Sequence, residues 1–285
     1  MIPYRINPMG ITLVETIPLT LTAASAESTV TLNATGSPTV SGLHYRLGKF
    51  GTWLPYTIGN TITLANVGDS VQFWNSAENL SSSSSNYVNF VLTGTVKAQG
   101  NIQSLLNFSR SCKAYCFISL FASCTSLMSA PALPATTLAD SCYRALFNGC
   151  SALTVAPKLP ATALATSCYR ATFLNCSGLT TAPALPATTI APYCYNSMFN
   201  GCSSLVIAPK LPAVTLRDNC YSYMFRYCTN LSSMEVSFTN WNSSEYSTYL
   251  WHEDVALGGT FTKPTALPEE YGADKIPSGW TVVNK

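Results

Sequence analysis

The sequence predicts an α+β protein, in which an antiparallel β-sandwich precedes a short curved solenoid of strand–helix units closed by a cap. Three observations lead to this prediction. Short β-type runs fill residues 1–100, a 26-residue unit repeats through residues 101–230, and the unit fades in residues 231–285. We therefore expect three domains with these bounds: an Ig-like sandwich, the solenoid and a C-terminal cap.

The predicted sandwich rests on runs rich in β-branched and aromatic residues, which turn residues separate at intervals of roughly ten. We expect strands at Leu19–Thr22, Ser28–Leu32, Leu43–Leu47, Thr52–Tyr56, Thr61–Leu64, Ser70–Trp74 and Tyr87–Leu92. A serine run at 81–85 is interpreted as a flexible loop tip, with a receptor-contacting loop as the alternative.

Cysteines and phenylalanines define the repeat. Ten of the eleven cysteines form two series with a 26-residue step, which start at Cys116 and Cys124, and Cys112 is left over. The phenylalanines that keep this step are Phe121, Phe147, Phe173, Phe199 and Phe225. The unit reads LxxAPxLPAxxLxxxCYxxxFxxCxx, and four full copies run over residues 127–230.

Each unit is predicted to contain a very short strand and then a helix. Prolines that follow the extended stretch cannot donate to a ladder, so the strand must be short. Leu164, Cys168, Phe173 and Cys176 then recur at spacings that place them on one broad helical face. This pattern predicts a helix over residues 165–176 and its equivalents.

The ends of these helices are also predicted. Asp140 and its counterpart Asp218 suit an N-cap. Gly149 and its equivalents Asn175 and Gly201 suit a left-handed helix exit. Tyr227 interrupts this series, which predicts a different last turn in that copy.

Stacking is required because a 26-residue unit cannot bury its own apolar face. Strands stack about 4.8 Å apart and helices about 8–10 Å apart, so the stack is predicted to curve. The phenylalanine series and Cys142, Cys168 and Cys194 are the predicted core. The wide helical spacing exceeds the roughly 7 Å limit for a disulfide, which predicts buried free thiols. Disulfides between units and zinc are less favoured alternatives, and a Cys112–Cys116 pair stays open.

The stretch LPATTLADSCYRALFNGCSALTVAPKLPAT closely resembles the 26-residue repeats of BspA-type leucine-rich-repeat surface proteins. The flanks at residues 41–46, 100–107 and 259–283 also look like those of such proteins. The resemblance implies the solenoid fold and binding at a surface, either adhesion to cells, matrix or microbes, or a role in a virion. It supplies no catalytic motif.

Catalytic chemistry is not predicted. The chain carries 10% charged residues and a net charge of +2, which does not indicate nucleic-acid binding, and no apolar run reaches the roughly 18 residues of a membrane span. His44 and His252 are the only histidines, and His252-Glu253-Asp254 cannot converge on one metal ion without partners. Nucleophile-elbow, zinc-protease and phosphate-loop motifs are missing. We expect no enzyme, cofactor or metal.

Charge and small residues mark a candidate binding surface on the repeats. Residues 101–230 carry a net charge of +6, and residues 231–285 carry −4. The candidate surface consists of Lys158, Lys210, Thr154, Thr180 and Val206. A solvated surface is the simplest interpretation, and attraction to an anionic polymer or head-to-tail pairing of copies is the alternative.

The tail contains Trp241, Trp251 and Trp280, which are interpreted as cap residues that cover the last apolar face. Carbohydrate stacking by one exposed tryptophan of this tail is the functional alternative.

These observations favour a non-enzymatic recognition protein. The chain starts at Met1 without a signal-peptide pattern, and free thiols suit a reducing cytosol, so a virion location is expected. The preferred role is a phage fibre or decoration protein contacting a bacterial surface. A secreted bacterial adhesin and a purely structural virion subunit are the alternatives. Expected partners are other virion or surface proteins, a cell-surface glycan or protein, and further copies of the chain, with no nucleic acid and no membrane insertion.

Overall fold

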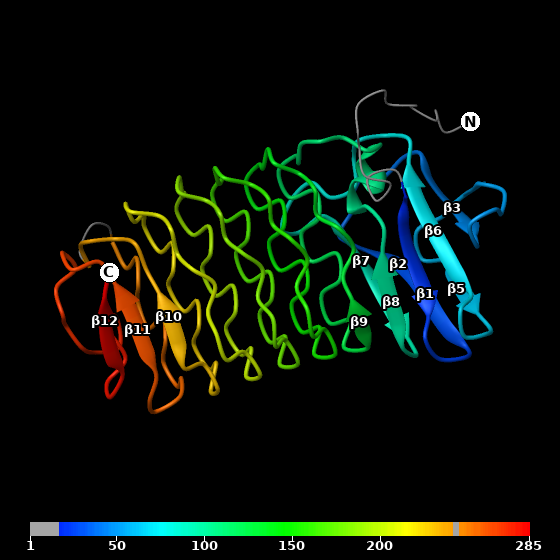
Figure 1. Cartoon of the computed structure of the whole chain (residues 1–285). Helices are drawn as coiled ribbons and strands as arrows, with labels where there is room; N and C mark the ends of the chain where they lie inside the picture. The colour runs from blue at the N-terminus through cyan, green and yellow to red at the C-terminus, as the bar shows by residue number, and fades with distance from the viewer. Residues whose placement is uncertain (1–16, 242–244) are drawn as a thin grey trace, which may run out of the picture.

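Two sheets form the N-terminal end of the protein (Figure 1). The computed structural model describes residues 17–241 and 245–285. The strands are β1 Leu19–Ala23, β2 Ser28–Thr35, β3 Leu43–Leu47, β4 Leu54–Pro55, β5 Thr61–Leu64, β6 Ser70–Asn75, β7 Tyr87–Thr93 and β8 Val96–Gln99. All seven predicted runs contain a strand, and β8 is an additional one. One sheet has the order β4-β3-β6-β1-β8-β9, where β9 is Leu127–Ser129, and the other has the order β5-β2-β7.

The two sheets share a core because alternate residues of each strand are apolar. Phe73 of β6 meets Phe90 of β7 with ring centroids 5.3 Å apart, and Tyr56 meets Phe73 at 5.4 Å. The strand pairs within this region are antiparallel. Outward positions carry mostly polar side chains, as expected for sheets with one solvated face.

The core continues from the sheets into the repeats. Strand β8 pairs in parallel with β9, Leu127–Ser129, which lies in the first full repeat. The 3-10 helix η2, Ile102–Leu106, lies at the junction and is capped by Asn101. Phe90 stacks on Phe121 with ring centroids 5.0 Å apart. The phenylalanine series of the repeats therefore begins on the sheet core.

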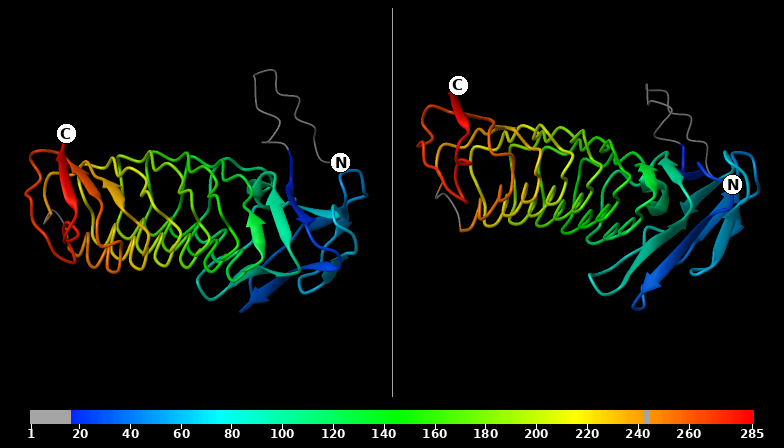
Figure 2. Two further views of the ribbon diagram at one scale, coloured as in Figure 1. Left: turned by 60° about the horizontal axis from the view of Figure 1, so that its bottom comes forward. Right: turned by 90° about the horizontal axis from the view of Figure 1, so that it is seen from below.

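The repeats form coils that lie side by side along the molecule (Figures 1 and 2). The predicted strand–helix solenoid is wrong, because the described residues contain no α-helix and the strands belong to three open sheets. Helix was predicted over residues 165–176, where the backbone N–H groups alternate between two kinds of partner. The N–H of Tyr169 donates to Cys194 O of the next coil at 3.0 Å, whereas that of Thr172 closes a turn onto Tyr169 O at 3.2 Å.

Left-handed residues explain why this segment is a series of turns. Ser167, Ala171 and Asn175 have φ values of 56°, 55° and 57°. An α-helix requires right-handed φ at every residue, so one left-handed residue in four prevents it.

Tyr227 has φ 60° and donates its N–H to Glu253 O of the next coil, which is the pattern of its equivalents in the other repeats. The prediction of a different last turn at Tyr227 is therefore wrong.

The predicted helix caps and the predicted curvature are wrong for the same reason. The Asp140 carboxylate accepts from the Thr166 N–H, one coil on, at 3.1 Å, so it joins coils and caps no helix. Curvature was predicted from the wide spacing of helices. Direct backbone hydrogen bonds join this side of neighbouring coils instead, and they remove the mismatch in spacing.

The C-terminal end closes the row with a parallel sheet of β10 Ser233–Glu235, β11 Thr260–Lys263 and β12 Thr281–Asn284. Trp241, Trp251 and Trp280 are all buried, and their indole N–H groups donate to backbone carbonyls. Carbohydrate stacking on an exposed tryptophan of this tail is therefore contradicted. No helix in the described part of the chain is long and apolar enough to cross a membrane.

Candidate functional site

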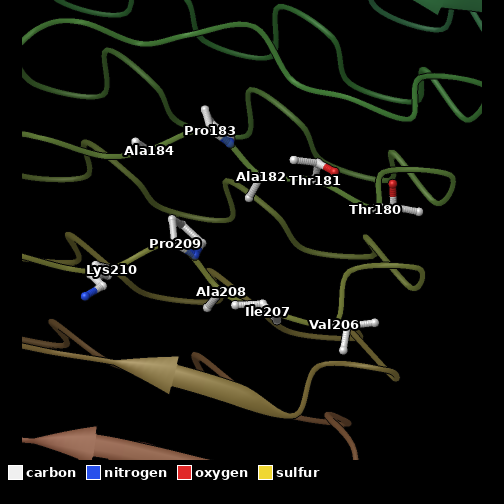
Figure 3. Close-up of a pocket in the computed structure, with 10 residues that line it drawn as sticks. All are labelled: Thr180, Thr181, Ala182, Pro183, Ala184, Val206, Ile207, Ala208, Pro209 and Lys210. Carbon is white, nitrogen blue, oxygen red and sulfur yellow. The ribbon is translucent and has the colours of Figure 1, made fainter.

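A shallow groove of about 430 Å³ lies between two neighbouring coils (Figure 3). Residues 180–184 form one wall and residues 206–210 form the other. Lys210 and Ala184 lie at one end of the groove, and Val206 and Thr180 lie at the other. Three of the five predicted surface residues, Thr180, Val206 and Lys210, thus line one feature.

Prolines explain why a groove forms here. Before them, the two coils of the groove are joined, because the N–H of Ser204 donates to Ser177 O at 3.2 Å. Pro183 and Pro209 have no N–H, so the extended stretches cannot continue their pairing. The walls of the groove are consequently two short extended segments that face solvent.

The lining is mainly apolar and small. Val206 and Ile207 are 47% and 65% exposed, which is unusual for β-branched aliphatic side chains. Alanine and proline side chains supply most of the remaining contact surface. This lining can bind the apolar face of a partner, and it contains no nucleophile or acid–base pair.

Lys210 is the charged group of the groove, and it is already paired. Its Nζ lies 3.0 Å from the Glu235 carboxylate, which Lys285 Nζ also contacts at 2.7 Å. Hydrogen bonds from Lys285, and then from Lys210, lower the pKa of Glu235 against the effect of desolvation. Because Lys210 is exposed and Glu235 is only partly buried, this pairing contributes little to stability.

Lys158 and Thr154 lie outside the groove lining. Lys158 is exposed and occupies the slot of Ala184 in the preceding repeat. The coil of Ala184 therefore separates Lys158 from Lys210, and the two lysines form no continuous basic track. Thr154 is exposed and joins the groove wall only through its carbonyl oxygen, which accepts from Thr180.

The predicted core residues lie inside the coils. The phenylalanine series is fully buried, as are Cys142, Cys168 and Cys194. The second cysteine of each repeat donates its S–H to the phenylalanine carbonyl of the preceding coil, for example Cys176 Sγ to Phe147 O at 3.1 Å. All eleven cysteines are free. The argument that wide helical spacing keeps the thiols apart is wrong, because neighbouring coils lie as close as strands. In the structure, the thiols are free, buried and, in the second series, hydrogen-bonded through their S–H groups.

Cys112 differs from the other cysteines. Its Sγ accepts from Gln103 Nε2 at 3.3 Å, and the thiols of Cys116 and Cys142 lie within hydrogen-bonding reach. Hydrogen bonds from Cys116 first, then Cys142, lower the pKa of Cys112, whereas burial raises the pKa of the other ten. Its place outside the 26-residue series is the sequence feature that marks it.

The side chains of His252 and Glu253 make contacts within the fold and do not form a common site. His252 is buried, its Nε2 lies 3.0 Å from Gly272 O, and desolvation lowers its pKa. Glu253 instead pairs with Arg226, whose guanidinium lies 4.4 Å from the Tyr227 ring centroid. Within the described ranges, no group of three or more His, Cys, Asp or Glu side chains is arranged so that it could hold a metal ion.

The serine run at residues 81–85 and His44 both lie in the N-terminal sheet region. Within the serine run, Ser81 Oγ accepts from the Val88 N–H at 3.1 Å and Ser83 Oγ accepts from the Asn86 N–H at 3.1 Å. Hydrogen bonds therefore tie this loop to the start of β7. His44 lies in β3, as predicted, with its ring on the outer face beside Trp74.

No family model, curated protein or solved structure matches the chain.

Proposed function

We propose that this chain is a non-enzymatic recognition protein, carried on a virion, that contacts a bacterial surface through its repeat coils. The exposed apolar groove between residues 180–184 and 206–210 is the observation that supports this proposal. Exposed aliphatic side chains gathered in one concave feature are typical of binding sites.

The construction of the coils supports a recognition role. Backbone hydrogen bonds connect each coil to the next, as from Tyr169 to Cys194 and from Phe173 to Met198. Stacked phenylalanine and tyrosine rings fill the interior. A surface held this rigidly loses little conformational entropy on binding.

The thiols support a virion over a secreted adhesin. Proteins that mature in oxidising compartments commonly carry disulfides, whereas cytosolic proteins keep free thiols. Eleven buried free cysteines in one chain suit folding and assembly in a reducing cytosol.

The groove is tested by the binding of fluorescently labelled protein to a panel of bacterial cells, measured by flow cytometry. The variant Val206→Glu/Ile207→Glu places two charges in the groove and should abolish binding. Val214→Glu is the matched control, since Val214 is 64% exposed and lies outside the groove lining. It should bind like the parent.

Two outcomes would contradict the proposal. Parent protein that attaches to no cell in the panel favours a structural spacer without a ligand. Binding that survives the double variant moves the contact surface away from the groove. If attachment is electrostatic, Lys158→Glu/Lys210→Glu and added salt should both weaken it.

A further inference from the structure

The outer face of strands β3 and β6 carries an unusual set of side chains. Inward residues such as Val71 and Phe73 belong to the core between the sheets. The alternate, outward positions of these strands hold His44, Arg46, Gln72 and Trp74. Large rings are uncommon on the solvated face of an antiparallel sheet, where polar residues are the rule. This face is therefore a candidate site, and it lies far along the chain from the groove.

Three rings lie together on this face. His44 and Trp74 are cross-strand partners, with ring centroids 5.3 Å apart and planes 33° apart. Trp53, from the loop before β4, meets Trp74 at 6.0 Å with planes 66° apart. The two indoles therefore form a corner whose walls are aromatic.

A row of polar groups runs beside the rings. The Arg46 guanidinium lies 4.7 Å from the Trp53 ring centroid, and its Nε donates to Gln72 Oε1 at 2.8 Å. Gln72 Nε2 in turn donates to Thr20 Oγ1 at 3.0 Å. These bonds cross three strands and hold the guanidinium in place against the ring.

Hydrogen-bonding capacity remains at the rings themselves. His44 Nδ1 lies 2.7 Å from Gly42 O; a carbonyl only accepts, so Nδ1 is the donor and Nε2 of the neutral ring is an acceptor. The buried indole N–H of Trp74 has no hydrogen-bond partner among the described residues. The corner thus combines apolar ring faces with the Nε2 acceptor of His44, and the Trp74 N–H lies buried behind them.

The adjoining loop adds exposed apolar groups. Phe50 is 90% exposed in the connection between β3 and β4, and Leu47 and Leu54 are exposed on either side of it. Exposed apolar side chains in this loop are available for contact with a partner.

We propose that this corner, formed by Trp53, Trp74 and His44 with Arg46 and Gln72 beside them, is a saccharide-binding site. A pyranose ring has an apolar C–H face that packs on an indole, and a rim of hydroxyls that both donate and accept. The corner offers both kinds of surface within one patch. A peptide strand would instead use an unpaired sheet edge, and the rings lie on the sheet face.

Tryptophan fluorescence of the full chain tests this proposal directly. Trp241, Trp251 and Trp280 are buried in the C-terminal end and supply a constant background, so a change on titration reports Trp53 and Trp74. The probes are hexasaccharides of β-linked glucose, of N-acetylglucosamine and of a uronic acid. At about 10 mM, even a site with a Kd of about 1 mM is mostly filled.

We expect a saturable change with at least one of these sugars. Trp53→Ala should weaken that binding about tenfold or more, and Trp53→Phe should restore part of it, because a ring is retained. Tyr246→Ala is the matched control, since Tyr246 is an exposed aromatic residue in the distant C-terminal region. Unchanged thermal melting of each variant shows that the fold is intact.

Other results would overturn the proposal. One is no saturable change with any of the three sugars. A second is equal affinity for the parent and Trp53→Ala. A third is a parent dimer by light scattering that Trp53→Ala converts to monomer without any sugar response, which would assign the face to self-association. The groove variant Val206→Glu/Ile207→Glu should keep the sugar response, so this test is separate from that of the proposed function.

Discussion

Phe173 and Phe199, one repeat apart in the sequence, stack with ring centroids 5.7 Å apart and ring planes 7° apart. The same contact recurs along the whole series from Phe121 to Phe225. Phe90 of the N-terminal sheet adds a ring to its start. Each coil is therefore held to both neighbours by the same aromatic contact.

Removal of one ring from this series should be costly at any position. Phe173→Ala should lower the free energy of unfolding by about 3–5 kcal/mol, because it leaves a cavity between two coils. Phe121→Ala should cost as much, since Phe121 is equally buried and stacks on both Phe90 and Phe147. Urea denaturation of both variants measures the loss. A clearly smaller loss for Phe121→Ala would mean that the first coil packs loosely on the sheets.

Two equivalent glycines provide a matched test of the left-handed turns. Gly149 and Gly201 both have φ 76°, so an L side chain is strained by about 1 kcal/mol at either position. A Cβ at Gly201 would lie 2.4 Å from Asn175 Oδ1, whereas one at Gly149 meets only ordinary contacts. We expect Gly201→Ala to lower the melting temperature more than Gly149→Ala. The reverse order would contradict the close approach of these coils.

Cys112 should be the first thiol to react. Hydrogen bonds from neighbouring groups lower its pKa, which favours its thiolate, whereas burial raises the pKa of the other ten thiols and favours their neutral form. Brief iodoacetamide treatment of native protein followed by peptide mapping should find label on Cys112. Cys112→Ser should remove this rapid labelling. Uniform labelling of all eleven cysteines would show that the coils open on the timescale of the reaction.

The protein should lose stability in alkali. Burial raises the pKa of Cys168, Cys176 and Cys228 to about 12. Burial also raises the pKa of the Tyr169 and Tyr221 phenols well above the ordinary value for tyrosine. When folding raises the pKa of a group, that group stabilises the folded state fully at any pH below its pKa in the unfolded chain. This stabilisation is lost as the pH rises toward the pKa of the group in the folded protein. For cysteine this window opens at roughly pH 8.5.

Urea midpoints measured from pH 7 to 11 check this expectation. The midpoint should not decrease up to about pH 8.5 and should then fall steadily. Cys112 has a lowered pKa and works in the opposite sense, with a contribution that is lost on acidification, but it is one group against many. A constant midpoint up to pH 11 would show that the thiols and phenols reach water in the folded state.

The periodic core could be predicted from the sequence, whereas the conformation between its residues could not. Leu164, Cys168, Phe173 and Cys176 are buried or partly buried, and helical periodicity was one explanation of their spacing. A series of tight turns brings the same residues inside. The choice between them depends on the hydrogen bonds of alternate N–H groups to the next coil, and those partners lie 25 residues away.

Parts of the two candidate sites were visible in the sequence. Thr180, Val206 and Lys210 were placed on one surface by their equivalent positions, and the structure brings them into one groove. The corner of Trp53 and Trp74 was not predicted, because twenty residues separate the two rings and only the pairing of β3 with β6 and β4 brings them together.

By itself, the sequence determined the 26-residue repeat, the residues that face its interior and the positions of the N-terminal strands, because each follows from local patterns of apolar and turn residues. Only the tertiary structure decided that the coils contain turns instead of helices. A left-handed residue in every four costs energy within one isolated coil, and hydrogen bonds to both neighbouring coils compensate for it. That compensation exists only when the coils are stacked, so it leaves no mark in any single repeat.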